Sequence, residues 1–185
     1  MDNPPEHIII YRNIKHPRLE YKTGTLTLIL PKTHKNPQQI LQKYQKWIQR
    51  KQNTITKALQ EAKTKTIIQN RTEKELKTLV NTLVQTYQKE LNTTIKKVFY
   101  RKMKTKWASH SKNGNLTVNT LLKYLPQNLI EYIIYHEIAH SIERKHNEKF
   151  WNIITKKYPD QQTKEKDLLT YWFIIQKTIN THKTQ

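Results

Sequence analysis

The sequence contains no cysteine, which excludes disulfide bonds and thiolate metal ligands, so any bound metal must be held by nitrogen and oxygen atoms. No run of about eighteen apolar residues occurs, and the first residues lack a basic stretch followed by an apolar one. We therefore expect a cytoplasmic chain without a membrane partner. At 185 residues, the length suits one domain or one domain with a smaller appended lobe.

Acidic residues are also scarce: the chain has 14 of them and 34 lysines and arginines. The net charge is therefore +20. The excess is shared equally between residues 1–95 and 96–185, so it is not a basic tail on a neutral body. Such a diffuse positive field favours polyanions such as nucleic acid or nucleotides. Compositional drift toward lysine would produce the same excess, and dedicated base recognition more often uses clustered arginine. A nucleic-acid partner therefore stays open.

The first half of the chain predicts a lobe of strands and helices over residues 1–93, without any residue spacing that suggests chemistry. Two runs rich in β-branched residues, 8–11 and 25–30, predict an antiparallel pair of strands. Helical spacing of apolar residues follows in three segments. These segments cover residues 37–51, 54–66 and 70–90.

From residue 94 the apolar period changes to two, which predicts a long strand over residues 95–107. Asn113 and Gly114 form a turn signal, and residues 115–119 predict a short strand that returns beside the long one. Lysines line one face of the long strand and alternate with aromatic residues. This pattern is compatible with a polyanion-binding groove, and equally with a solvated strand face at the rim of a site.

The pattern H-E-x-x-H follows, inside an apolar helix that we expect to run from Pro126 to about Arg144. Its histidines, His136 and His140, are four residues apart and so lie on one face of the helix, about one turn from each other. That spacing lets both imidazoles bind one zinc ion, with Glu137 beside them to act on metal-bound water. The pattern predicts a zinc hydrolase.

A third ligand is needed for such a site, and His146 follows the helix within a few residues. Two further helices are predicted, over residues 146–157 and 163–179. A stop at Tyr158-Pro159-Asp160 separates them. The last residues, 181–185, are expected to fray.

Taken in order, the motifs W-x-S-x-S, N-x-T-x-N, H-E-x-x-H, H-N-x-x-F-W and Y-P-D resemble those of the YgjP-like metal-dependent hydrolases, over nearly the whole chain. They stand at residues 107–111, 115–119, 136–140, 146–151 and 158–160. The resemblance implies an α+β fold with a zincin-like catalytic domain over residues 94–180, in which an antiparallel hairpin packs on the H-E-x-x-H helix. A small strand pair and helices precede this domain.

The resemblance also implies that His136, His140 and His146 bind zinc and that Glu137 is the general base. The family is grouped with zinc metallopeptidases and is also linked to hydrolysis of nucleoside triphosphates. This chain departs from the family pattern at His110, where the family has cysteine, and at Thr120-Leu121, where Trp-Arg is usual. The imidazole of His110 could stabilise charge or bind a phosphate near the metal, or it could simply face solvent.

A metallopeptidase is the favoured function, in which the strand over residues 97–107 would offer its edge to an extended peptide. The alternative is a nucleoside triphosphate pyrophosphohydrolase, because basic side chains on that strand could bind phosphates. The candidate substrate contacts are Arg101, Lys102, Lys104, Lys106, His110 and Asn119.

The positive charge also suits a peptidase that works near nucleic acid, as the related SprT-like proteins do. A third reading is a zinc-binding protein associated with nucleic acid and without catalysis. Glu137 argues against that reading, because a purely structural site has no use for an unligated carboxylate between two ligands.

Overall fold

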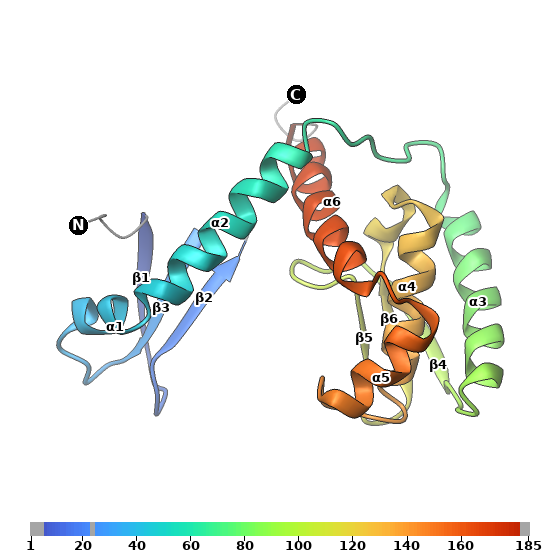
Figure 1. Ribbon diagram of the computed structural model, residues 1–185, viewed down its shortest axis with the longest axis horizontal. Helices are drawn as coiled ribbons and strands as arrows, with labels where there is room; N and C mark the ends of the chain where they lie inside the picture. Colours follow the sequence, from blue (N-terminus) through green and yellow to red (C-terminus); the bar gives the residue numbers. More distant parts are fainter. Residues whose placement is uncertain (1–5, 23–24, 182–185) are drawn as a thin grey trace. The chain divides into compact units, whose positions relative to one another are not determined.

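The computed structural model describes residues 6–22 and 25–181, and the chain divides into two compact units, Met1–Lys63 and Thr64–Gln185. Both units combine helices with a small three-stranded sheet, which confirms the expected α+β class (Figure 1). The division falls well before residue 93, because the helix over residues 73–90 packs into the core of the second unit. Within the described residues, no helix is both long enough and apolar enough to cross a membrane.

The first unit contains the strands β1 (His7–Arg12), β2 (Arg18–Lys22) and β3 (Thr25–Pro31) and the helices α1 (Pro37–Lys43) and α2 (Gln45–Glu61). The sheet order is β1-β3-β2, with β1 parallel to β3 and β2 antiparallel to it. The predicted antiparallel pairing of residues 8–11 with 25–30 was therefore wrong. The unpredicted strand β2 makes the return, so β1 and β3 run in the same direction.

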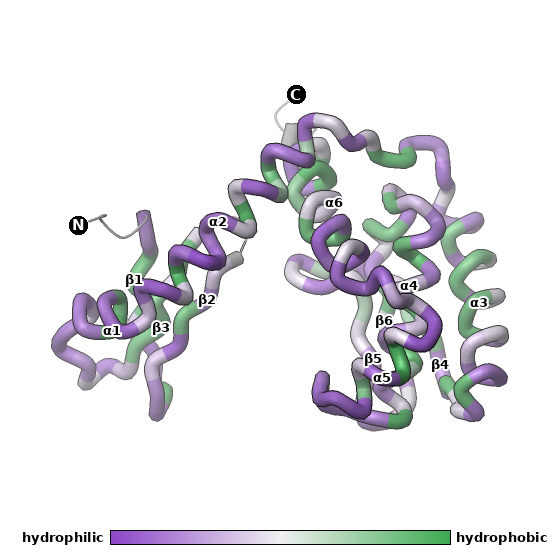
Figure 2. The backbone as a smooth tube through the Cα atoms, viewed as in Figure 1, coloured by the Kyte–Doolittle hydropathy of each residue, from purple (hydrophilic) through white to green (hydrophobic). Residues whose placement is uncertain are grey.

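A small apolar core joins this sheet to its helices. Pro37 occupies the start of α1, as expected, and Asn36 caps the helix by accepting a hydrogen bond from the backbone of Gln39. Figure 2 shows hydrophobic and hydrophilic residues alternating along α2, which is the pattern of a helix with one buried side. The fully or nearly buried members of the core are Leu26, Leu28, Leu30, Leu41 and Ile48.

The second unit contains the site predicted from the sequence. Its elements are α3 (Glu73–Glu90), β4 (Lys97–Arg101), β5 (Ala108–His110), β6 (Asn115–Asn119), the 3-10 helix η1 (Thr120–Tyr124), α4 (Gln127–Ala139), α5 (Glu148–Lys157) and α6 (Gln161–Thr181). The apolar side chains of α4 form the centre of its core, packed between α3 and the sheet. The tail expected to fray over residues 181–185 lies outside the described residues from 182 onward.

The sheet of this unit differs from the prediction of one long strand with a returning partner. Its order is β4-β6-β5, with β4 parallel to β6 and β5 antiparallel to it. The predicted strand over residues 95–107 breaks after Arg101, because the buried amide of Asn119 binds the backbone of Met103 and Lys106 and bends the intervening loop. The hairpin at Asn113-Gly114 is real but joins β5 to β6, and Gly114 takes the positive φ that this turn requires.

Candidate metal centre

The site is built on the end of α4, which finishes earlier than the sequence suggests. The helix was expected to continue to about Arg144, but its last residue is Ala139, and His140 is the C-terminal cap. Backbone bonds from Ser141 to Ile138 and from Ile142 to Ala139 tighten the final turn. The chain can then reverse direction, which brings His146 back over the helix.

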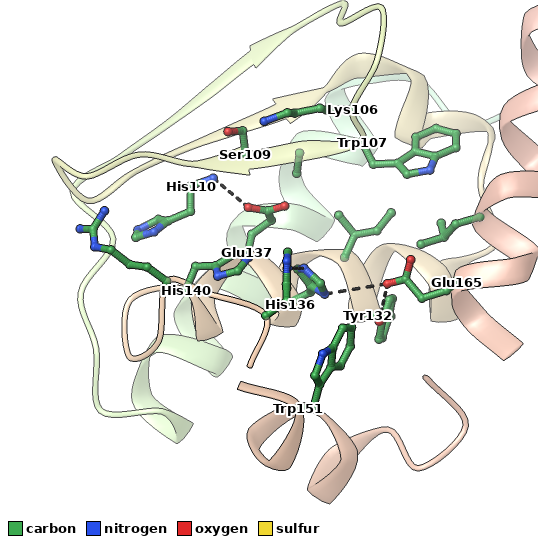
Figure 3. Close-up of a pocket in the computed structure, with 15 residues that line it drawn as sticks. Lys106, Trp107, Ser109, His110, Tyr132, His136, Glu137, His140, Trp151 and Glu165 are labelled. Carbon is green, nitrogen blue, oxygen red and sulfur yellow. Dashed lines mark hydrogen bonds and ion pairs between the residues drawn. The ribbon is translucent and has the colours of Figure 1, made fainter. Parts of the chain in front are cut away.

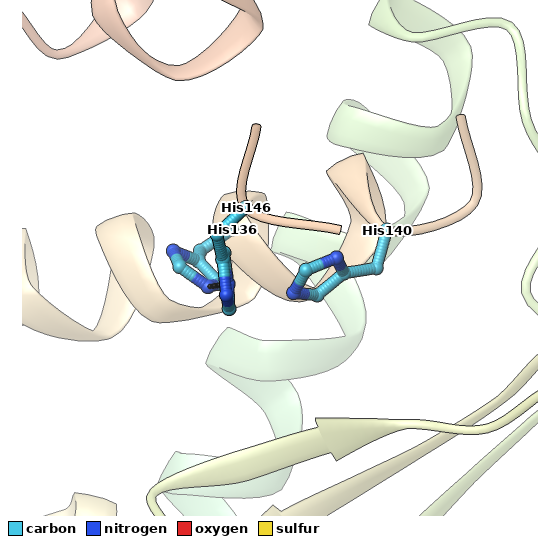
Figure 4. A group of neighbouring side chains, drawn as sticks. All are labelled: His136, His140 and His146. Carbon is cyan, nitrogen blue, oxygen red and sulfur yellow. Dashed lines mark hydrogen bonds between the residues drawn. The ribbon is translucent and has the colours of Figure 1, made fainter. Parts of the chain in front are cut away.

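His136, His140 and His146 come together on one side of α4 (Figure 4). Their candidate ligand atoms all lie within 4.8 Å of one another. The Nε2 atoms of His136 and His146 are 3.0 Å apart. Two nitrogens bound to one tetrahedral zinc ion at about 2.05 Å would be separated by about 3.3 Å, so this pair already has nearly the spacing of shared ligands. The three residues therefore fit a metal ion chemically and geometrically.

The second nitrogens of the histidines have different surroundings. The Nδ1 atom of His140 lies 3.0 Å from the backbone oxygen of Glu143, which accepts a hydrogen bond from Nδ1–H and leaves Nε2 with its lone pair toward the cluster. The Nδ1 atom of His136 is buried and makes no hydrogen bond in the described structure. It lies 4.0 Å from Oε1 of Glu165, which itself accepts a 2.6 Å hydrogen bond from the hydroxyl of Tyr132.

Aromatic rings of α5 support the cluster. Phe150 is fully buried and its ring lies 4.5–4.9 Å from the rings of all three histidines, stacking on His140 and meeting the other two edge-on. Trp151 stacks on His146, with 5.6 Å between ring centroids. The side chain of Asn147 caps α5 by accepting a hydrogen bond from the backbone N–H of Phe150. This cap sets the start of the helix that carries both rings.

Burial favours the neutral form of His136 and His140, which is the form that binds metal. It lowers the pKa of His136 to about 3, with His140 and His146 contributing further. Burial also lowers the pKa of His140, although its bond to the Glu143 carbonyl acts in the opposite direction.

Glu137 lies beside the cluster and faces β5 (Figure 3). Its Oε2 atom accepts a 2.8 Å hydrogen bond from the backbone N–H of His110. Burial raises the pKa of Glu137 to about 7, while the His110 N–H and the charge of Lys106 lower it in part. Glu137 thus lies next to the candidate ligands while bonded to the neighbouring strand.

The three histidines and Glu137 line a cavity of about 590 Å³. Of the predicted substrate contacts, Lys106 and His110 lie on its wall. Arg101, at the end of β4, and Lys102 and Lys104, on the loop after it, are exposed and do not line the cavity. Asn119 does not line it either: its side chain is fully buried and holds that loop.

Sequence reasoning missed several residues of the cavity. Glu165 and Tyr132 lie behind His136, and Arg144 stands at the wall, where it also donates to the backbone oxygen of Lys112. Phe150 and Trp151 belonged to a recognised motif but were assigned no part in the site. Tyr132 precedes His136 by one helical turn, so helical spacing could have placed it nearby; no local spacing relates Glu165 to either residue.

Two solved structures are similar to this chain. One is the metallopeptidase zymogen of Pyrococcus abyssi abylysin, with 27% identity over 47% of this chain and 87% of that chain, and a TM-score of 0.41. The other is the metallopeptidase zymogen of Methanocaldococcus jannaschii jannalysin, with 26% identity over 54% of this chain and 88% of that chain, and a TM-score of 0.42. No curated protein matches the sequence.

The family comparison agrees with the motifs and with the position of the histidine cluster. Residues 52–171, well over half of the chain, match the model of the YgjP-like, metallopeptidase domain. This match includes all of α3 and α4, the second sheet and the three histidines. The chain therefore belongs to the YgjP-like family of metallopeptidase domains.

Proposed function

We propose that this chain is a zinc-dependent peptidase in which His136, His140 and His146 hold the metal and Glu137 is the general base. The observation that carries this proposal is the convergence of the three imidazoles beside a buried carboxylate in one cavity. Nitrogen-only donors at this spacing suit zinc, which favours four-coordinate sites. When bound, zinc would supply Lewis acidity that polarises a substrate carbonyl and acidifies a water molecule.

Glu137 would accept the proton of the attacking water and return it to the leaving nitrogen. The His110 N–H engages Oε2, so Oε1 is the oxygen left for proton transfer. A base fixed through a backbone donor keeps its position while the proton moves, because the strand that supplies the donor is itself paired with β6.

Glu165 and Tyr132 would orient His136. If Nε2 of His136 binds the metal, Nδ1 carries a proton and needs an acceptor, and Oε1 of Glu165 is the carboxylate near it, at 4.0 Å. Tyr132 donates to the same carboxylate from one turn earlier on α4. Carboxylates behind metal-bound histidines fix the tautomer and ring orientation.

The open edge of β5 would bind the peptide. The Trp107 carbonyl accepts a backbone hydrogen bond from Asn119, and the Ser111 N–H donates one to Asn115. Because such bonds alternate along an antiparallel pair, Ala108 would turn its N–H and C=O toward the free edge of the sheet. This edge borders the cavity, and an extended peptide could add to it as a further strand.

The nucleotide alternative receives less support from the geometry. That alternative requires several cations near the metal site to bind phosphates. Of the predicted cations Arg101, Lys102, Lys104 and Lys106, only Lys106 lies on the cavity wall. A peptide backbone needs no such set of cations.

The test compares zinc-loaded wild type with Glu137→Gln on a quenched-fluorescence peptide mixture and on nucleoside triphosphates. Glu131→Gln is the matched control, because Glu131 lies on the same helix outside the cavity and bonds to Gln127. The proposal is supported if wild type and Glu131→Gln cleave peptides and Glu137→Gln keeps its zinc but cleaves them about 100-fold more slowly or worse. Equal activity of Glu137→Gln would overturn the mechanism, and hydrolysis of triphosphates alone would overturn the substrate.

A further inference from the structure

The second sheet presents on β4 a solvent-facing surface that does not line the cavity and that the hydrolytic mechanism does not use. Along β4 the side chains alternate: Val98 and Tyr100 turn inward, and the hydroxyl of Tyr100 donates to Asn81 of α3. Lys97, Phe99 and Arg101 turn outward and are exposed. The alternation follows from the strand period, so all three lie on one face.

Phe99 is the unusual member of this set. Its side chain is 47% exposed, although its neighbours Leu116 and Val118 on β6 are fully buried on the opposite face. Among the described ring contacts none involves Phe99, so its ring faces solvent between two cations. A phenyl ring that is about half exposed in this position offers a flat apolar surface to a binding partner.

The loop after β4 extends the positive charge. Lys102 and Lys104 are exposed, and the loop that carries them is held by the buried amide of Asn119, which bonds to the backbone of Met103 and Lys106. Among the described ion pairs, none uses these lysines or the cations of β4. We call Lys97, Phe99, Arg101, Lys102 and Lys104 the β4 face.

We propose that the β4 face binds single-stranded nucleic acid, with its cations on the phosphates and a base stacked on Phe99. The charge complementarity is strong, because the face contains four cations and no carboxylate and belongs to a chain of net charge +20. An exposed aromatic ring among cations is the combination by which proteins hold unpaired bases, whereas a duplex keeps its bases stacked within the helix. The loop is already ordered by Asn119, so little conformational freedom is lost on binding.

The experiment measures fluorescence anisotropy of a labelled single-stranded DNA of about 15 nucleotides and of its duplex, across a salt series, with the full chain. The face variant is Lys97→Gln/Arg101→Gln/Lys102→Gln/Lys104→Gln. Its control, Lys74→Gln/Lys89→Gln/Lys156→Gln/Lys166→Gln, removes the same charge from exposed positions on α3, α5 and α6. All these side chains are exposed, so both variants are expected to keep the wild-type far-ultraviolet circular dichroism.

The face variant should bind the single strand at least tenfold more weakly. The plot of log K against log salt should become less steep, its slope losing about 3 in magnitude, since each of the four lost phosphate contacts contributes about 0.7 to that slope. The control variant should change affinity by less than about threefold. Phe99→Ala should weaken binding about tenfold with the slope unchanged, and Phe99→Tyr should bind like wild type, because stacking needs the ring and no charge.

Four results would overturn the proposal. Equal losses in the face and control variants would show attraction by net charge alone. Unchanged binding by Phe99→Ala would remove the stacked base. Equal competition by polyglutamate and by single-stranded DNA, or tighter binding of the duplex, would assign the surface to another polyanion. None of these results bears on peptide cleavage, which uses different residues.

Discussion

The backbone N–H of His110 donates to Oε2 of Glu137 at 2.8 Å, and this bond links the β5 strand to the carboxylate next to the histidine cluster. The bond comes from the main chain, so it does not depend on which side chain stands at position 110. The imidazole of His110 points elsewhere, with Nε2 at 3.4 Å from the hydroxyl of Ser141.

His110→Ala should therefore keep the position of Glu137 and reduce kcat/KM by less than about tenfold, far less than Glu137→Gln does. The measurement is steady-state peptide cleavage at matched zinc content. A loss as large as that of Glu137→Gln would show that the imidazole itself takes part in the reaction, as one interpretation of the sequence held.

Local spacing predicted that the three histidines come together, and contacts between residues distant in sequence determine their surroundings. His136, Glu137 and His140 follow from one helical pattern, and His146 lies close behind it in the chain. The contact between His136 and Glu165 joins α4 to α6, so no periodicity could show it. The end of α4 at Ala139 was missed because tight turn bonds, rather than a glycine or proline, stop the helix.

In the sheets, too, local patterns indicate the strands, whereas contacts between distant residues determine how the strands pair. Apolar alternation located the strands, but pairing depends on residues far apart: Asn119 bends the loop after β4, and this decides that β4 lies parallel to β6. The strand β2 was not predicted, although it has a short strand-like pattern: Leu19 and Tyr21 alternate with polar residues and pack on the core of the first unit. Local sequence does specify the start of α3, where Thr72 caps the helix by accepting a hydrogen bond from the backbone N–H of Glu75.

His146→Ala should lower bound zinc from about one ion per chain to a small fraction of that, because two imidazoles alone hold zinc weakly. His16→Ala is the control, since His16 is an exposed histidine of the first unit. Elemental analysis after dialysis against buffer without zinc measures the difference. Full zinc in His146→Ala would remove this residue from the ligands.

Glu165→Gln should weaken zinc binding about 10- to 100-fold, because an amide is a poorer acceptor for the Nδ1 proton of His136. Tyr132→Phe should have a smaller effect in the same direction, since it removes only the donor to that carboxylate. Competition with a chromophoric chelator gives the affinities without any activity assay. Wild-type affinity in Glu165→Gln would leave the carboxylate without a role at His136.

Phe150→Leu should destabilise the zinc-free chain by about 1–3 kcal/mol and also weaken zinc binding, because the fully buried ring supports all three imidazoles. Ile154→Val, one turn later on α5 and equally buried, should cost about 0.5–1.5 kcal/mol without changing the zinc affinity. Denaturant unfolding and chelator competition separate the two effects. An affinity loss that is the same in both variants would assign Phe150 to general packing alone.

The capping box of α3 should make part of the stability depend on acid. The Thr72 backbone N–H and then its hydroxyl bond to the Glu75 carboxylate and hold the pKa of Glu75 below its ordinary value of 4.5. Because the folded-state pKa is the lower one, the bond stabilises the fold fully above the unfolded pKa and is lost as pH falls through the folded value. Glu75→Gln should therefore flatten the fall in unfolding free energy between about pH 6 and pH 3. Glu73→Gln, which removes the same charge from the same turn outside the box, should not.

Thr72→Ala should lower the unfolding free energy by about 1 kcal/mol near neutral pH. Urea unfolding at each pH tests this, and an unchanged pH profile in Glu75→Gln would show that the box contributes nothing to acid sensitivity.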